Sequence, residues 1–322
     1  MTDNEDFERQ TARYRREILA ICYRMMGCTA DAEDAAQETW VRAWQAFDHF
    51  DEQRASLRTW LYRIATNACL NALEGRRHRA LPSGLGLPPT SGSAPIAPGA
   101  DDIPWLEPIP DAFFRTSPPD PCEALLAKGH LRLAVVAATQ LLPPRQRAIL
   151  LLREVLDLPA SEVAEALDTT VAAVNSGLQR ARAQLSSAEV LTESVLEPSA
   201  PERRMLVDRY VEAFERADVA ALQALLTDEA ILEMPPLSIW VRGRADYARF
   251  VQRVFDMRGR DWRVSFTAAN GQPAFAAYAA SRDGTHALHT LQVLDVTARG
   301  ISRNVVYQDP RLLARFGLSP TV

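Results

Sequence analysis

The stretch RASLRTWLYRIATNACLNALEGRRHR, residues 54–79, decides the fold of the N-terminal part of the chain. Its apolar residues recur at spacings of four, three and four, which places them on one face of an amphipathic helix: Leu57, Leu61, Ile64 and Ala68. The same stretch carries six Arg and one Glu, although the formal net charge of the whole chain is −5. A basic helix that also bears Trp and Asn favours a surface that contacts nucleic acid. A solvated charged face with a half-buried Trp is the alternative.

Length and composition indicate a protein of several domains. The chain has 322 residues, of which 47% are hydrophobic, and this is enough for two or three cores. Its four cysteines have no metal-ligand spacing, so we expect reduced thiols in the cytoplasm, with no metal and no cofactor. No apolar run approaches the roughly 20 residues that span a bilayer, so we expect no membrane partner.

The pattern changes several times along the chain. Residues 7–80 are helical in pattern, and residues 81–122 form a linker rich in Pro and Gly. Helical periodicity resumes over 123–188, and a further block covers 203–322. That last block begins as helix and then alternates with strand periodicity in four segments, at 262–269, 273–281, 286–296 and 301–308.

The helix before residue 54 has the opposite charge. The segment DAEDAAQETWVRAWQAF begins at Asp31, a plausible N-cap, and residues 29–53 hold seven acidic residues and one Arg. DNA would repel this helix, so we expect it to contact a protein.

Together, DAEDAAQETWVRAW and FDEQRASLRTWLYRIATNACLN resemble the second conserved region of extracytoplasmic-function (ECF) sigma factors. The resemblance implies that the acidic helix binds core RNA polymerase through Asp34, Gln37, Glu38 and Trp44. It implies that the basic helix reads the −10 element of promoter DNA, and that the loop 50–56 captures a flipped base. The implied −10 residues are Arg54, Arg58, Trp60, Arg63, Asn67, Asn71, Arg76 and Arg77.

Residues 143–185 have the pattern of a helix-turn-helix unit. Pro143 and Pro144 begin a helix, SEVAEALD is a short helix with Ser161 as its N-cap, and VAAVNSGLQRARAQL follows a tight turn. The buried side of the last helix is expected to hold Val171, Val174, Leu178 and Leu185.

This unit resembles the fourth region of sigma factors, which reads the −35 element. The residues implied for that role are Thr170, Asn175, Ser176, Gln179, Arg180 and Arg182. Many ECF relatives carry a basic pair at the positions that Asn175 and Gly177 hold here, so fewer phosphate contacts are expected.

The linker contains WLEPIP, which resembles a motif of ECF factors that carry a C-terminal extension. Trp105 and Leu106 are therefore candidates for docking between domains. A linker that merely packs one Trp is the alternative.

The C-terminal block resembles a SnoaL-like domain with the NTF2-type cone fold. The expected fold class is multidomain: two all-α sigma domains, one of them a helix-turn-helix, followed by an α+β cone. The candidate pocket residues are Trp240, Asn270, Gln272, Tyr278, His286 and His289. The two His are an odd number of residues apart and so lie on opposite faces of a regular strand, which leaves no pair for acid–base catalysis.

The expected function is a sigma factor, not an enzyme, whose partners are core RNA polymerase and promoter DNA. In this interpretation the cone modulates activity in cis and is a candidate for binding a small-molecule ligand. Two alternatives stay open. The cone converts a small molecule while the sigma domains tether it to DNA, or it is a dimerisation module.

Overall fold

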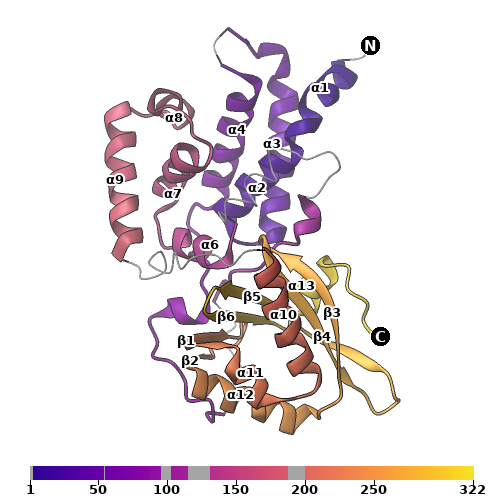
Figure 1. The fold of residues 1–322 in the computed structure, drawn as a ribbon. Coiled ribbons are helices and arrows are strands. Elements are labelled where there is room, and N and C mark those ends of the chain that lie inside the picture. Colours follow the sequence, from indigo (N-terminus) through magenta and orange to yellow (C-terminus); the bar gives the residue numbers. More distant parts are fainter. Residues whose placement is uncertain (1–2, 54, 96–102, 115–130, 188–199) are drawn as a thin grey trace. The chain divides into compact units, whose positions relative to one another are not determined.

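The computed structural model describes residues 3–53, 55–95, 103–114, 131–187 and 200–322 (Figure 1). The chain forms two compact units. The first unit holds residues 1–79 and 106–193, and the second holds residues 80–105 and 194–322. The chain therefore passes from one unit to the other three times. Among the described residues, no helix is both long and apolar enough to cross a bilayer.

The first unit begins with a helical bundle. Its helices are α1 (Asp3–Thr11), α2 (Arg15–Met26), α3 (Thr29–Ala46) and α4 (Leu57–Ala72). Gly27 ends α2 with a φ of 68°, a left-handed conformation that suits glycine. Ser56 caps α4 because its side chain accepts a hydrogen bond from the Thr59 amide. Helix α3 begins two residues before Asp31, after an extended Cys28, so the predicted N-cap at Asp31 was wrong.

The rest of the first unit contains the predicted helix-turn-helix. Its helices are α6 (Leu133–Gln140), α7 (Pro144–Leu150), α8 (Ala160–Ala166) and α9 (Val171–Ser187), and a π-helical turn, Leu151–Val155, continues α7. Helix α8 follows Pro159, whose carbonyl accepts a hydrogen bond from the Val163 amide, so Ser161 is not the N-cap. Val174, Leu178 and Leu185 are buried as expected, whereas Val171 is 44% exposed and was wrongly assigned to the buried face.

The second unit is built on one mixed sheet. Its strands are β1 (Leu226–Glu233), β2 (Trp240–Arg242), β3 (Trp262–Ala269), β4 (Gln272–Ala280), β5 (His286–Thr297) and β6 (Gly300–Tyr307). They lie in the order β2-β1-β6-β5-β4-β3, with β1 and β6 parallel and the other neighbours antiparallel. The four predicted strands are present, but β1 and β2 were not predicted, and the sheet is not purely antiparallel.

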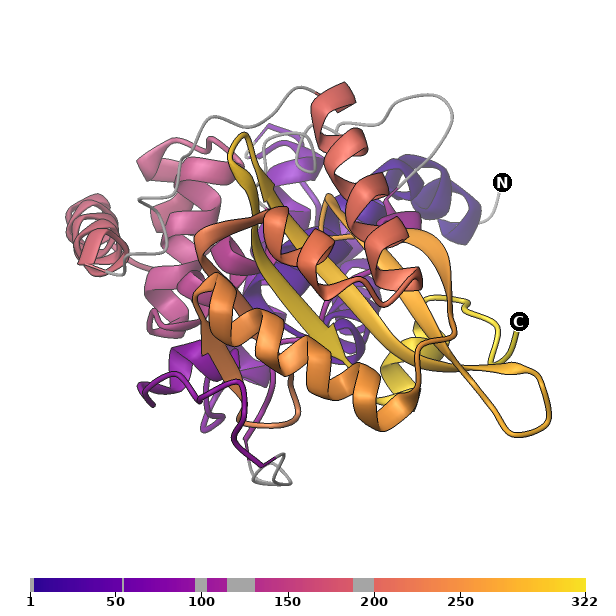
Figure 2. The ribbon, with the colours of Figure 1, turned by 60° about the horizontal axis from the view of Figure 1, so that its bottom comes forward.

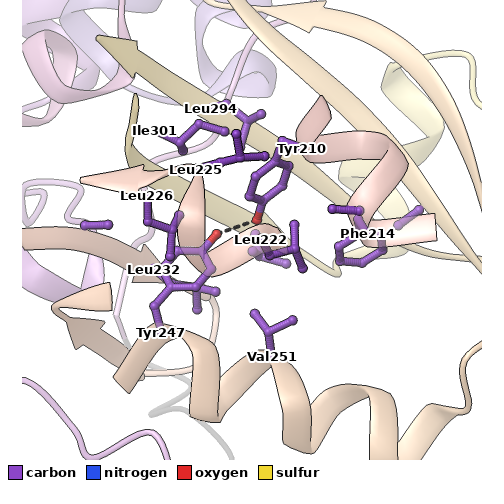
Figure 3. Packing of buried hydrophobic residues seen from close by; sticks show 14 of the residues in the cluster. Tyr210, Phe214, Leu222, Leu225, Leu226, Leu232, Tyr247, Val251, Leu294 and Ile301 are labelled. Atoms are coloured by element: carbon purple, nitrogen blue, oxygen red, sulfur yellow. Dashed lines mark hydrogen bonds between the residues drawn. The ribbon is translucent and has the colours of Figure 1, made fainter. Parts of the chain in front are cut away.

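Three helices cover one face of this sheet. They are α10 (Ala200–Glu215), α11 (Val219–Ala224) and α12 (Arg244–Arg258), and Figure 2 shows them in front of the strands. A short helix, α13 (Pro310–Arg315), follows β6. The core between helices and sheet is apolar, and Phe214, Leu232 and Val251 are among its residues (Figure 3). Within it, the hydroxyls of Tyr210 and Tyr247 lie 2.5 Å apart.

Candidate nucleic-acid interface and cone cavity

Helix α3 presents an exposed face at helical spacing. Asp34, Gln37, Glu38 and Trp44 are all exposed, and Trp44 is 55% exposed although it is a large aromatic. Val41 lies between them and is also exposed. The opposite side of α3 is buried in the bundle. An exposed Trp and Val amid acidic residues are typical of a surface that another protein covers.

The predicted −10 residues on α4 and just after it divide by their contacts. Arg58 forms an ion pair with the buried Glu17, a bond that raises the pKa of Arg58, and its guanidinium lies 5.3 Å from the Tyr62 ring centroid. Arg76 lies 3.3 Å from Asp31. Arg58 therefore supports the bundle itself, whichever DNA contacts it also makes.

Two other predicted −10 residues, Asn71 and Arg77, are exposed. Trp60 belongs to an aromatic cluster with Phe47 and Phe50, whose ring centroids lie 6.5 and 5.1 Å from its own. Arg54 lies outside the described residues.

Helix α8 lies against the outer side of α4. Thr59 donates a hydrogen bond of 3.0 Å to the Glu162 carboxylate, and the Asn67 amide donates one of 3.4 Å to the Ala166 carbonyl. Arg63 lies 4.0 Å from Glu165. A hollow of about 480 Å³ lies between α8 and residues 49–53, 55 and 56, which include most of the loop 50–56 expected to capture a base. Glu162 and Glu165 on α8, in the unit predicted to read the −35 element, therefore occupy the face of α4 that is predicted to read the −10 element.

A buried guanidinium also joins the helix-turn-helix unit to the bundle. Arg147 on α7 is 3% exposed and donates to the Met25 carbonyl, to the Gln140 side chain at 2.7 Å and to the Thr139 carbonyl at 3.0 Å. Burial lowers its pKa to about 10. Gln140 in turn donates to the Arg24 carbonyl at 3.1 Å.

Helix α9 has the surface expected of a recognition helix. It contains no acidic residue, and most of its predicted −35 residues are exposed: Asn175, Gln179, Arg180 and Arg182. Thr170, just before α9, is also exposed and caps the helix by accepting from the Ala173 amide, while Ser176 is half-buried and accepts from Arg180. Arg182 is paired with Glu154.

Gly177 lies where α9 packs against α7. A Cβ at Gly177 would lie 2.6 Å from Ile149 Cδ1, so glycine lets α9 pack closely on α7.

The second unit contains a cavity between the helices and the sheet. It has a volume of about 120 Å³ and is lined mainly by apolar side chains, with polar groups on β5 and β6. Of the predicted pocket residues, His289 lines this cavity, and Trp240, Asn270, Gln272 and Tyr278 are not among its lining residues. Asn304, Gln292 and Thr290 also line it, and none of the three was predicted.

The two His of HALH have different surroundings. His289 is the extra residue of a β-bulge, since Thr290 pairs with Ala277 while Leu288 pairs with Tyr278. Burial lowers the pKa of His289 to about 4, and the charge of Arg258 contributes. His286 instead lies 3.0 Å from Asp261, and it is not among the residues that line the cavity. The cavity's ionisable lining residues are His289 and the exposed Arg258.

Three family models match the chain. They are Sigma-70 region 2 over residues 11–79, Sigma-70 region 4 over 132–185, and the SnoaL-like domain over 207–308. The chain is 46% identical over 315 residues to the ECF RNA polymerase sigma factor SigG of Mycobacterium tuberculosis. The match covers 97% of this chain and 84% of that protein. The chain belongs to the ECF sigma factor family. It is a transcription initiation factor with a fused SnoaL-like domain, not an enzyme.

A second relative has the same architecture in a solved structure. The ECF sigma factor SigJ of Mycobacterium tuberculosis is 28% identical over 244 residues, or 74% of this chain and 69% of that protein. Its crystal structure matches 95% of this chain and 97% of its own, with a TM-score of 0.64 at 22% identity. This structural likeness shows that the two share a fold.

In this sigma factor, part of the region 2 to region 4 linker is bound to the SnoaL-like domain. We call residues 81–95 the linker strap. The Thr90 amide donates to the Trp240 carbonyl at 2.7 Å, on the edge strand β2, and the Trp240 indole donates to the Leu87 carbonyl at 3.2 Å. The Gly92 amide donates to Asp246 at 2.8 Å. These contacts resemble the addition of a peptide to the edge of a sheet.

The contacts of the strap involve buried and confined groups. The Ser83 amide donates at 2.8 Å to Glu233, which is fully buried and paired with Arg303. At Gly92, a Cβ would lie 2.2 Å from the Asp246 carbonyl oxygen. The backbone of the strap therefore fits the domain surface so closely that position 92 has no room for a side chain.

The two predicted docking residues belong to different units. Trp105 lies in the second unit and forms a parallel bridge with Ala80. Leu106 is fully buried in the first unit and contacts the position of Gly27, and the next residue, Glu107, hydrogen-bonds Gly27 and Tyr23. The linker segment 80–105 is thus a loop whose ends meet, and the chain changes units between Trp105 and Leu106.

Proposed function

We propose that this ECF sigma factor binds core RNA polymerase through the exposed face of α3 and reads promoter DNA with α4 and α9. The proposed domains are 7–80 for region 2, 123–188 for region 4 and 203–322 for the regulatory domain, and the site of action is the cytoplasm. The acid-free, exposed face of α9 is the observation that carries the −35 assignment. Asn and Gln side chains there suit adenine edges, and Arg suits phosphate.

Run-off transcription with core RNA polymerase tests the DNA assignment, with the DNA upstream of the protein's own gene as template. Replacing Asn175 and Gln179 by Ala should reduce transcript yield by about tenfold or more, because each lost base contact costs about 1–3 kcal/mol. Arg263→Ala, an exposed change on β3 of the SnoaL-like domain, is the control. Equal yields from all three proteins would contradict the assignment.

The contact between α8 and α4 represents a closed form that must open on promoter DNA. The −35 and −10 elements are named for positions about 25 base pairs apart, which is about 85 Å at 3.4 Å per base pair. Helix α8 adjoins α9 and touches α4 through Thr59 and Asn67, so the two DNA-reading helices are far closer than that. Both cannot reach their elements while this contact persists.

The SnoaL-like domain modulates activity in cis by holding the linker strap. The linker connects the two DNA-reading domains, and it is bound by backbone hydrogen bonds to Trp240 and Asp246. The conformation of the linker therefore depends on the conformation of the SnoaL-like domain. The cavity has no pair of groups for acid–base catalysis, so we propose ligand binding, without turnover, as its role.

Two glycines of the strap provide a matched test. Gly92→Val places a side chain where a Cβ already meets the Asp246 carbonyl oxygen at 2.2 Å, whereas Gly84→Val points into open space. In the full-length protein, Gly92→Val should make residues 81–95 more accessible to protease and change run-off yield. Gly84→Val should leave both unchanged. A protease-sensitive strap with unaltered transcription would refute the regulatory role of the strap while leaving the sigma assignment intact.

A further inference from the structure

The cavity of the SnoaL-like domain reaches the surface at one end. Most of its lining side chains are buried, and apolar ones such as Leu232, Phe250 and Trp262 form its inner wall. Two lining residues at the C-terminal end of α12, Met257 and Arg258, are exposed instead. We call these two residues the mouth of the cavity. A ligand that enters there can bury an apolar part and keep a polar head group in water.

The mouth carries a positive charge without an acidic partner. Among the described residues, Arg258 forms no ion pair, and no Asp or Glu lines the cavity. The nearest acidic residues along the chain are engaged elsewhere. Asp256 accepts a hydrogen bond of 2.8 Å from Gln252, and Asp261 lies 3.0 Å from His286. An unpaired guanidinium beside an apolar space favours a ligand that brings a negative group.

The charge of Arg258 also acts on a side chain inside the cavity. Burial, with a further contribution from Arg258, lowers the pKa of His289 to about 4. His289 lines the cavity, and its ring centroid lies 5.6 Å from that of Trp262. A cation that disfavours a proton on this ring stabilises an anion placed nearby by the same Coulombic effect. Because His289 is uncharged near pH 7, Arg258 supplies the positive charge of the lining at neutral pH.

The space beyond the mouth suits a short apolar chain. Its volume of about 120 Å³ is close to the roughly 150 Å³ that accommodates benzene in an engineered protein cavity. A chain of about five or six carbon atoms fills such a space. Each methylene that moves from water into it should tighten binding about fourfold, so the chain supplies most of the affinity.

We propose that this cavity binds a short amphiphilic carboxylate, with its apolar chain among the buried side chains and its carboxylate beside Arg258. The inference rests on the proposed ligand-binding role of the cavity and adds the chemical class of the ligand. A fatty acid of about six carbon atoms has this chemistry.

The experiment titrates the full-length protein with three probes that share a five-carbon tail: hexanoate, pentanol and pentylammonium. Ligand-detected NMR, which suits weak binding, measures their dissociation constants. Hexanoate should bind about two- to fivefold more tightly than pentanol, because its head group gains an exposed ion pair. Pentylammonium should bind most weakly, because Arg258 repels it. Equal binding of the three probes, tightest binding of pentylammonium, or no binding of any probe would overturn the proposal.

Two arginine variants test the role of Arg258. Arg258→Gln should abolish the preference for hexanoate and leave pentanol binding unchanged. Arg263→Gln is the matched control, because Arg263 is exposed on β3 next to Trp262 and does not line the cavity, and it should keep the preference. Arg258 also lies at the end of α12, where a cation stabilises the helix dipole. If that were its only role, Arg258→Gln would destabilise the fold and keep the preference, which would refute the proposal.

Two size variants place the binding in this cavity. Val254→Phe removes room for about two methylenes and should weaken hexanoate and pentanol binding about tenfold or more. Met205→Phe, at an exposed position on α10 that does not line the cavity, should not weaken it. Hexanoate binding that Val254→Phe leaves unchanged would refute the assignment. If Val254→Phe weakens pentanol binding but hexanoate has no advantage over pentanol, the proposed class is wrong while the proposed ligand-binding role holds.

Discussion

Removing the acidic contacts of α8 should favour the open form of the sigma factor. The perturbation is the double variant Glu162→Ala, Glu165→Ala. Glu162 accepts a partly buried hydrogen bond of 3.0 Å from Thr59, which we value at about 1 kcal/mol. Glu165 lies 4.0 Å from Arg63 in an exposed pair, worth about 0.2–1 kcal/mol after screening by solvent.

The two contacts together stabilise the closed form by about 1–2 kcal/mol, which corresponds to a factor of about 5–30 in the opening equilibrium. Binding to core RNA polymerase reports this factor if only the open form binds, since apparent affinity scales with the competent fraction. Affinity should therefore rise by about 5–30-fold. Fluorescence anisotropy of labelled sigma factor titrated with core polymerase measures it, and no promoter sequence is needed.

Loss of negative charge by itself could strengthen association, so the control removes the same charge elsewhere. Glu212 and Glu229 are exposed glutamates of the SnoaL-like domain, and each is paired with an Arg. Their double replacement by Ala should leave the affinity for core polymerase unchanged. An equal gain in both double variants, or no gain in either, would refute the argument that opening limits binding to core polymerase.

Three further predictions concern stability and are measured by urea unfolding. Arg147→Met should lower the free energy of unfolding by about 3–5 kcal/mol, because it leaves several buried acceptors unpaired. The control Arg145→Met should lower it by about 1 kcal/mol, because Arg145 makes one hydrogen bond to a carbonyl. Equal losses in the two variants would contradict this prediction. Gly177→Arg, which restores the basic residue of many relatives, should cost about 1–3 kcal/mol, because its Cβ would lie 2.6 Å from Ile149 Cδ1, and an unchanged midpoint would show that the helices adjust freely. The pKa of His289 is lowered from 6.5 to about 4, so protonation of the unfolded chain lowers the free energy of unfolding as the pH falls from 6.5 toward 4. The expected loss is about 2–3 kcal/mol relative to pH above 6.5. The loss should be smaller in His289→Leu than in the unsubstituted protein.

Local periodicity predicted the elements that contain their own pattern. Helix α4 was confirmed because its whole apolar stripe lies within one stretch, although its cap, Ser56, was not predicted. Strands β3 to β6 alternate clearly and were predicted, whereas β2 has three residues and is too short for alternation to appear. The start of α8 was misplaced because Pro159 precedes the helix and its carbonyl accepts the first hydrogen bond, so no Ser cap is needed.

The candidate sites depended on long-range contacts to different degrees. The exposed residues of α9 follow from one helix, so sequence could predict them. The cavity joins residues from helices and strands that are distant in the chain, and only His289 was predicted among its lining residues. Asn304 offered a signal, because a lone amide amid the apolar residues of a strand must find partners. Its partner Tyr210 is 94 residues away, and no local pattern identifies it.

The course of the linker explains how a C-terminal domain can act on two DNA-reading domains that precede it. A domain joined to the chain only at residue 194 would have a single covalent connection to the sigma domains. Here the loop 80–105 also belongs to the second unit, and its ends meet where Ala80 bridges Trp105. The linker that must extend for promoter binding is therefore part of the regulatory unit itself. Under the proposed regulation, a change of packing in the SnoaL-like domain that loosens Trp240 or Asp246 would release the strap directly.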